Sequence, residues 1–278
     1  MGGSLDTNLR KLSNKDRAQD LVYQAMEAPT LELHMMLVRQ ALDLDPENVD
    51  ALLMTVDIAE LQGDERIEVL RGIVATGAKQ LGKKAFKELV PHFWGFHETR
   101  PYMRARQQLA GELYRADRLE EAIQEYNEML TLNEDDNQGV RFQLLACLLS
   151  RGRLPEVRAL MERFVDDCQW NVVFAWGHVL EKLLCKDEAE ATKALAHART
   201  QNLHIEKFLT GRTKLPKNMP DYYSPGSKEE AACFAAPLVK TWAHHPEAVA
   251  WLSSQSKPAR KSAVNKSKEK KSDAQGES

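Results

Sequence analysis

Small and large apolar residues follow one another at fixed intervals in the middle of the chain. Ala110 and Ala122 are twelve residues apart, and Tyr126 and Met129 follow Ala122 by four and seven residues. This spacing places the apolar side chains on one face of each of two helices. Alanine at the crossing lets two antiparallel helices approach closely, and the larger side chains fill the space beside it. The pattern predicts a helix–turn–helix unit over 103–136.

The same pattern recurs after 35 residues. A second unit is predicted over 137–171, with its turn at Arg151-Gly152-Arg153, and weaker matches flank the two clear units over 28–77 and 172–205. Short helices that recur without long loops favour a helical-repeat solenoid over an irregular helical bundle. We therefore expect an all-α fold, in which antiparallel helix pairs build one repeat domain over 1–256.

Composition agrees with a helical fold and limits the possible chemistry. Only 7% of the 278 residues are aromatic, and there are 14 glycines and 11 prolines, so few strand-forming and turn-forming residues remain. The four cysteines lack the spacing of a zinc site, so we expect reduced thiols, no metal and no cofactor. Neither a secretory signal nor a run of 18 apolar residues is present, which predicts a cytoplasmic protein without a membrane partner.

Charge is distributed unevenly along the chain. The net charge is -3, but the segment 257–278 contains seven basic and three acidic residues, so the preceding 256 residues carry -7. The segment has no aromatic residue, and we expect a disordered basic tail. Binding of nucleic acid through this tail is an alternative interpretation.

Two segments depart from the repeat pattern. The first, 91–106, combines aromatic residues with two histidines and three arginines. We interpret it as a structural joint that buries Phe93, Trp94 and Phe96, and the alternative is a cationic pocket for a carboxylate or phosphate group.

The second segment, 215–227, contains three prolines, which exclude a helix. Helices are predicted to follow over 227–253, beginning with a capping box at Ser227. Trp242 and Trp251 would cap the end of the repeat domain. The adjacent tyrosines at 222 and 223 are expected to brace the loop, although they could also present a recognition surface.

Three motifs resemble segments of uncharacterised bacterial tetratricopeptide (TPR)-like repeat proteins. They are Trp94–Arg106, Leu130–Arg141 and Tyr222–Glu230, within a match that covers Pro91 to Leu252. A more distant similarity links the chain to the eukaryotic suppressor-of-tumorigenicity family. The resemblance implies an all-helical TPR-like scaffold with no assigned reaction. The zinc-chelating Cys-rich module of some bacterial relatives and the membrane spans of the eukaryotic family are absent from this sequence.

TPR proteins that grip chaperone C-termini use Lys, Asn and Arg on their inner helices as a carboxylate clamp. The comparable positions here hold Arg104, Gln107 and Gly111 in one unit and Gln138, Arg141 and Leu145 in the next, so the clamp is not reproduced. Candidate partner-binding residues on the concave surface are nevertheless predicted by their positions; they are Arg100, Arg104, Gln107, Tyr114, Gln138 and Arg141.

No common catalytic motif occurs in the sequence. We therefore expect a non-enzymatic, cytosolic protein–protein interaction scaffold that binds a peptide or partner helix in its concave groove. An unrecognised hydrolase that uses Glu98 and a nearby histidine is a further alternative.

Overall fold

The structure, a computed structural model, describes residues 13–255 of the chain. Within that range it contains fourteen α-helices, two short 3-10 helices and no strand, which confirms the all-α prediction. The predicted disordered tail, 257–278, lies outside the described residues. The elements are α1 (Asn14–Met26), α2 (Leu31–Leu44), α3 (Val49–Ile58), α4 (Gly63–Glu88), η1 (Phe93–Gly95), η2 (His97–Thr99), α5 (Arg100–Arg115), α6 (Leu119–Leu132), α7 (Val140–Ser150), α8 (Leu154–Arg163), α9 (Val165–Trp170), α10 (Val172–Leu184), α11 (Glu188–Gln201), α12 (Ile205–Leu209), α13 (Lys228–Ala243) and α14 (Pro246–Gln255).

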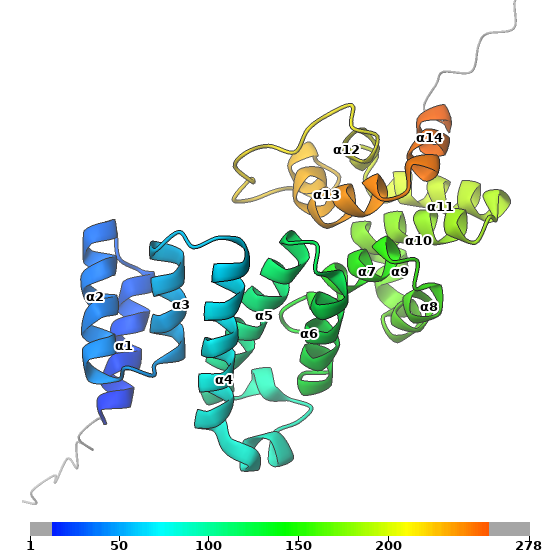
Figure 1. Ribbon diagram of the computed structural model, residues 1–278. Helices are drawn as coiled ribbons and strands as arrows, with labels where there is room; N and C mark the ends of the chain where they lie inside the picture. The colour runs from blue at the N-terminus through cyan, green and yellow to red at the C-terminus, as the bar shows by residue number, and fades with distance from the viewer. Residues whose placement is uncertain (1–12, 256–278) are drawn as a thin grey trace, which may run out of the picture.

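Five helix pairs follow one another along the molecule (Figure 1): α1/α2, α3/α4, α5/α6, α7/α8 and α10/α11. In the last three pairs the connecting turn holds one residue at positive φ, namely Asp117, Gly152 and Lys186. These residues are 35 and 34 positions apart, the period expected from the sequence. A left-handed residue ends the first helix and lets the second run back along it.

The regularly spaced apolar residues that predicted the first helix pair lie in the core. Ala110 and Ala122, at the crossing of α5 and α6, are fully buried, and Tyr126 and Met129 are at most 2% exposed. A close approach also joins α7 to α10. A Cβ placed on Gly177 would lie 2.9 Å from a methyl carbon of Leu145, so glycine allows this approach.

The segment between α4 and α5 is the structural joint expected from the sequence, with one difference. The helix α4 changes direction at Gly82, where φ is 67°, and the rings of Phe86, Phe93 and Tyr102 pack together beyond it. Phe93 is buried and Trp94 is partly buried. Phe96 was expected to be buried but is 39% exposed, because it lies between two short 3-10 turns at the surface.

The residues after α12 form a loop, as the three prolines predicted, and the chain then returns as α13. Figure 1 shows α13 lying above α5 and α7, and it packs against α7, α10 and α12. The Thr241 hydroxyl donates a hydrogen bond to the Ala146 carbonyl (3.0 Å), and the Tyr114 hydroxyl donates one to the Pro237 carbonyl (3.0 Å). Trp242 is completely buried there. We call the side of α3, α5, α7 and α10 on which α13 lies the inner face.

In the described part of the chain, none of the helices is long and apolar enough to cross a membrane.

Tyr114→Phe tests how α13 is held. Burial raises the pKa of the Tyr114 hydroxyl to about 12, above the value of about 10 in an unfolded chain. The folded state therefore holds the phenol proton more tightly, and this preference stabilises the fold fully below pH 10. That stability is lost as the pH rises from 10 towards 12. We expect the variant to lose about 1 kcal/mol of unfolding free energy at pH 8, from the missing hydrogen bond. Its deficit relative to the wild type should shrink above pH 10.

Urea unfolding at each pH measures both quantities. Tyr23→Phe, at an exposed tyrosine of α1, is the control and should match the wild type. A deficit for Tyr114→Phe that is constant up to pH 12 would contradict this assignment.

Candidate functional site

The six predicted partner-binding residues lie on α5 or at the beginning of the next helix pair, and they do not converge on one common site. Arg100, Arg104, Gln107 and Tyr114 belong to α5, whereas Gln138 lies in the loop before α7 and Arg141 in its first turn. The structure does not bring the arginines together in one cationic pocket, because each of them contacts a different group of the chain.

Arg104 connects α5 to the N-terminal helices. Its guanidinium donates two hydrogen bonds to the Asp50 carboxylate of α3, at 2.8 and 2.5 Å. Gln19 of α1 donates a third to the same carboxylate, at 3.1 Å. The Asp50 side chain is only 2% exposed, so its charge depends on these donors for compensation.

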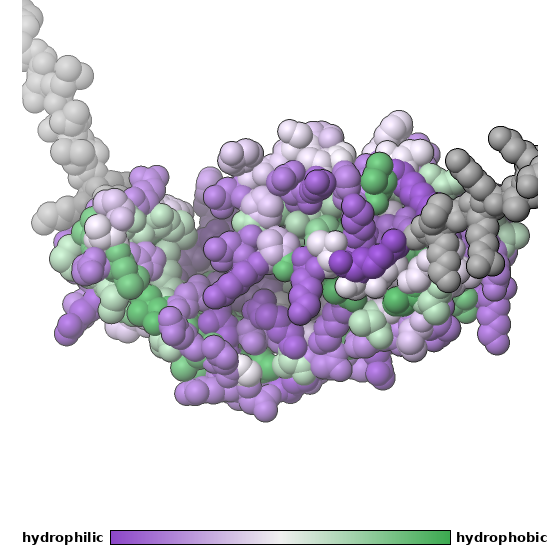
Figure 2. Space-filling model, turned by 90° about the horizontal axis from the view of Figure 1, so that it is seen from above, coloured by the Kyte–Doolittle hydropathy of each residue, from purple (hydrophilic) through white to green (hydrophobic). Residues whose placement is uncertain are grey.

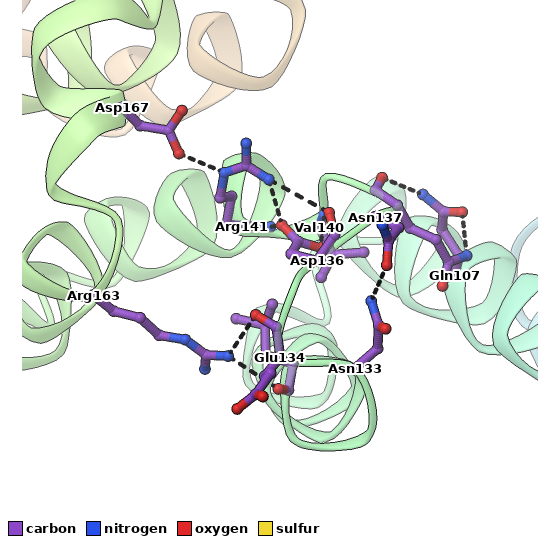
Figure 3. Close-up of polar contacts among 11 residues, drawn as sticks. Gln107, Asn133, Glu134, Asp136, Asn137, Val140, Arg141, Arg163 and Asp167 are labelled. Atoms are coloured by element: carbon purple, nitrogen blue, oxygen red, sulfur yellow. Dashed lines mark hydrogen bonds and ion pairs between the residues drawn. The ribbon is translucent and has the colours of Figure 1, made fainter. Parts of the chain in front are cut away.

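Arg141 is enclosed in the same way one repeat further on (Figure 3). It donates to Asp167 of α9 at 2.6 Å and to Asp136 of the α6–α7 loop at 2.9 Å. Its guanidinium also lies 4.3 Å from the centre of the Phe142 ring. Asp136 in turn accepts the backbone N–H of Val140 at 2.8 Å and so caps α7. Arg141 therefore has a structural role in joining α7 to α9.

The remaining candidates are also engaged within the chain. Gln107 and Gln138 pair through their side-chain amides at 2.8 Å, which joins α5 to the α6–α7 loop. Arg100 donates to the Trp94 carbonyl at 2.9 Å and stabilises the joint before α5. Tyr114 is covered by α13.

What stays open is the part of the inner face between α3 and α5. A cleft of 470 Å³ lies between the α3–α4 turn and the C-terminal end of α5, and Arg66, Glu112 and Arg115 are among the residues that line it. Figure 2 shows a recess with hydrophilic walls between the N-terminal helices and the part of the molecule around α13. We call this recess the inner cleft.

Charges in the inner cleft are balanced in a chain of ion pairs. Glu112 is only 7% exposed and lies 3.3 Å from Arg66 and 2.6 Å from Arg115. Arg66 also pairs with Asp57 at 2.6 Å. Arg115 is 62% exposed, and Glu112 keeps Arg66 as a second partner if Arg115 turns away from it. Gly111, one turn before Arg115, leaves space above the helix, because a Cβ there would meet only the Arg115 guanidinium, at 3.7 Å.

Sequence reasoning missed Asp57, Arg66 and Glu112. Arg66 and Glu112 are 46 positions apart and belong to different helix pairs, and α4 lay in a unit whose repeat frame was weak. The signal that could have found them is their polar character at positions that the repeat directs inwards.

The candidate acid–base pair forms no catalytic constellation in the described residues. Glu98 and His97 are exposed and line a separate cleft of 350 Å³ between α1 and the start of α5. Neither side chain makes a hydrogen bond or ion pair within the described range. No group of three or more His, Cys, Asp or Glu residues in that range could hold a metal ion.

Neither a protein-family model, nor a curated protein, nor a solved structure matches the chain.

Arg104→Met tests the connection between the N-terminal helices and α5. The substitution leaves the buried Asp50 carboxylate with Gln19 as its remaining side-chain donor. We expect a loss of about 3 kcal/mol of unfolding free energy. Arg115→Met, which removes an exposed arginine from a pair within one helix, should cost less than about 1 kcal/mol.

Chemical denaturation of the two variants measures the contrast. Adding Asp50→Asn to Arg104→Met should recover part of the loss, since the neutral amide needs no counter-charge. Equal and small effects of both arginine substitutions would contradict the proposed role of Arg104.

Proposed function

We propose that this protein is a non-enzymatic protein–protein interaction scaffold of TPR-like repeats, which binds a segment of a partner protein in the inner cleft. A cytoplasmic location is part of the proposal. The free state of Cys147, Cys168, Cys185 and Cys233 supports it, since thiols stay reduced in that compartment.

The succession of helix pairs supports a solenoid. Turns at Asp117, Gly152 and Lys186 repeat at 35 and 34 residues, and each pair contacts the next along the chain. Repeats of this kind align the first helix of each pair on one side, which creates an extended surface for a ligand.

The observation that carries the proposal is the position of α13. Over α7 and α10 the inner face already binds a helix, which belongs to the chain itself. Part of this contact is made to backbone carbonyls at the C-terminal ends of α5 and α7: Lys240 donates to the Tyr114 carbonyl at 3.1 Å, and His245 lies 2.9 Å from the Leu149 carbonyl. The surface is therefore suited to a peptide backbone or helix, and the inner cleft is its uncovered continuation.

The chemistry of the inner cleft favours a mixed polar segment as the ligand. Arg115 can donate hydrogen bonds to a carboxylate of the partner, and the amide of Gln62, which also lines the cleft, both donates and accepts hydrogen bonds. Because Asp57, Arg66 and Glu112 compensate one another, the floor of the cleft carries no large excess charge. We infer that the partner is recognised by hydrogen bonds and shape more than by net charge.

Peptide binding to the inner cleft can be tested with a variant that partly fills the cleft. The full chain is immobilised and screened against a phage-displayed library of short random peptides, and enriched peptides are synthesised and measured by fluorescence anisotropy. Gly111→Gln places a side chain beside the Arg115 guanidinium, which lines the inner cleft, and removes no side-chain contact. We expect it to weaken peptide binding by at least about tenfold, or about 1.4 kcal/mol.

Gly72→Gln is the matched control. Gly72 also lies inside a helix, α4, and a Cβ there meets nothing within 4 Å, but it lies outside the inner cleft. This variant should bind as the wild type does. Failure to enrich any peptide, or equal weakening by both substitutions, would contradict the proposed function.

A further inference from the structure

A second groove lies at the N-terminal end of the molecule, on the α1–α2 pair. The apolar faces of α1 and α2 that contain Val22 and Val38 form a cluster with Ala51 of α3. Beside this cluster, between α1 and α2, is a groove of 490 Å³, lined by Asp20, Leu21, Gln24, Gln40, Asp43 and Leu44, together with Arg17. We call it the terminal groove.

In the later helix pairs, the first helix of the pair packs against the helix that precedes it in the chain. Thus α4 packs against α5, and α6 packs against α7. The helix α1 is the first described element, and within residues 13–255 no helix covers the terminal groove. By the geometry of the later pairs, a helix is the element that fits there.

Apolar side chains also remain exposed on α2, outside the residues that line the groove. Met36 lies one turn before Gln40 on the same face of α2 and is 48% exposed, and Leu31 and Met35 at the start of α2 are 64% and 45% exposed. Figure 2 shows hydrophobic side chains on this N-terminal part of the molecule. Exposed methionines are common on surfaces that accept apolar helix faces, because the side chain is flexible and polarisable.

The N-terminal helices carry the whole negative excess of the described chain. Residues 13–70 contain thirteen acidic and four basic residues, a net charge of -9. Residues 71–255 contain 24 acidic and 25 basic residues, a net charge of +1. The acidic field is therefore confined to α1, α2, α3 and the first turns of α4.

We propose that the terminal groove binds a basic amphipathic helix of another protein. Leu21, Leu44 and Met36 take up its apolar face, and Asp20 and Asp43 face the lysines or arginines at its edges. Arg17 also lines the groove, so the partner helix is expected to carry no lysine or arginine opposite it.

Two other occupants fit less well. The chain's own basic segment, 257–278, has Val264 as its single β-branched residue and no Leu, Ile, Met or aromatic residue, so it lacks an apolar face. A second copy of the terminal groove would bring like charges together, since each copy of the region 13–70 carries -9.

The test uses the full chain and a fluorescein-labelled synthetic peptide of lysine and leucine, with its leucines on one helical face. Fluorescence anisotropy at low salt should show binding that weakens as salt is added. Asp20→Asn with Asp43→Asn should weaken it by roughly three- to tenfold. Met36→Gln should weaken it by roughly threefold through the lost apolar contact.

Glu65→Gln with Glu68→Gln is the charge-matched control, because both glutamates are exposed on α4, outside the groove; its affinity should stay within about twofold. A scrambled isomer of the peptide, without an apolar face, should bind weakly. Three results would overturn the proposal: equal weakening by the two double variants, equal binding of the scrambled peptide, or a dimer in sedimentation that the Asp20/Asp43 variant dissociates.

Discussion

The contact between α13 and the inner face determines how much of that face is covered by the chain itself. The contact buries Trp242 completely and joins Thr241 to the Ala146 carbonyl. It therefore belongs to the main core, whose buried residues run from α3 to α14. Because α13 covers α7, α10 and the end of α5, the inner face within the described residues is uncovered only towards the N-terminal helices.

Buried carboxylates explain why the arginines of the inner helices do not form a binding pocket. Asp50, Asp136 and Glu181 have side chains at most 2% exposed, and each is paired with an arginine of another element, namely Arg104, Arg141 and Arg158. Such pairs fix the register between neighbouring helix pairs, since an unpaired charge there would be costly. Arg115 of α5, by contrast, keeps 62% of its side chain exposed while it pairs with Glu112 of the same helix.

Repeat spacing predicted the elements well because it depends on local sequence. The ladder at Ala110, Ala122 and Tyr126 specified two helices and their buried faces, and the turn at Gly152 was found in the expected place. The candidate site was harder to predict. The sequence does not show whether an inward-facing basic residue contacts solvent or a distant carboxylate. Arg104, for example, binds Asp50, which lies 54 residues earlier in the chain. The return of α13 to the inner face after a proline-rich loop depends on tertiary packing, which no local pattern contains.

Hydrogen–deuterium exchange across the full chain measures the central claim, that α13 is a permanent part of the inner face. If it is, amides in α13 exchange as slowly as those in α7 and α10, because all three then open only with the core. Amides of the loop 212–226 should exchange much faster. If the amides of α13 exchanged at the rate of that loop while α7 and α10 stayed protected, the inner face would be open along its whole length, and the account would be contradicted.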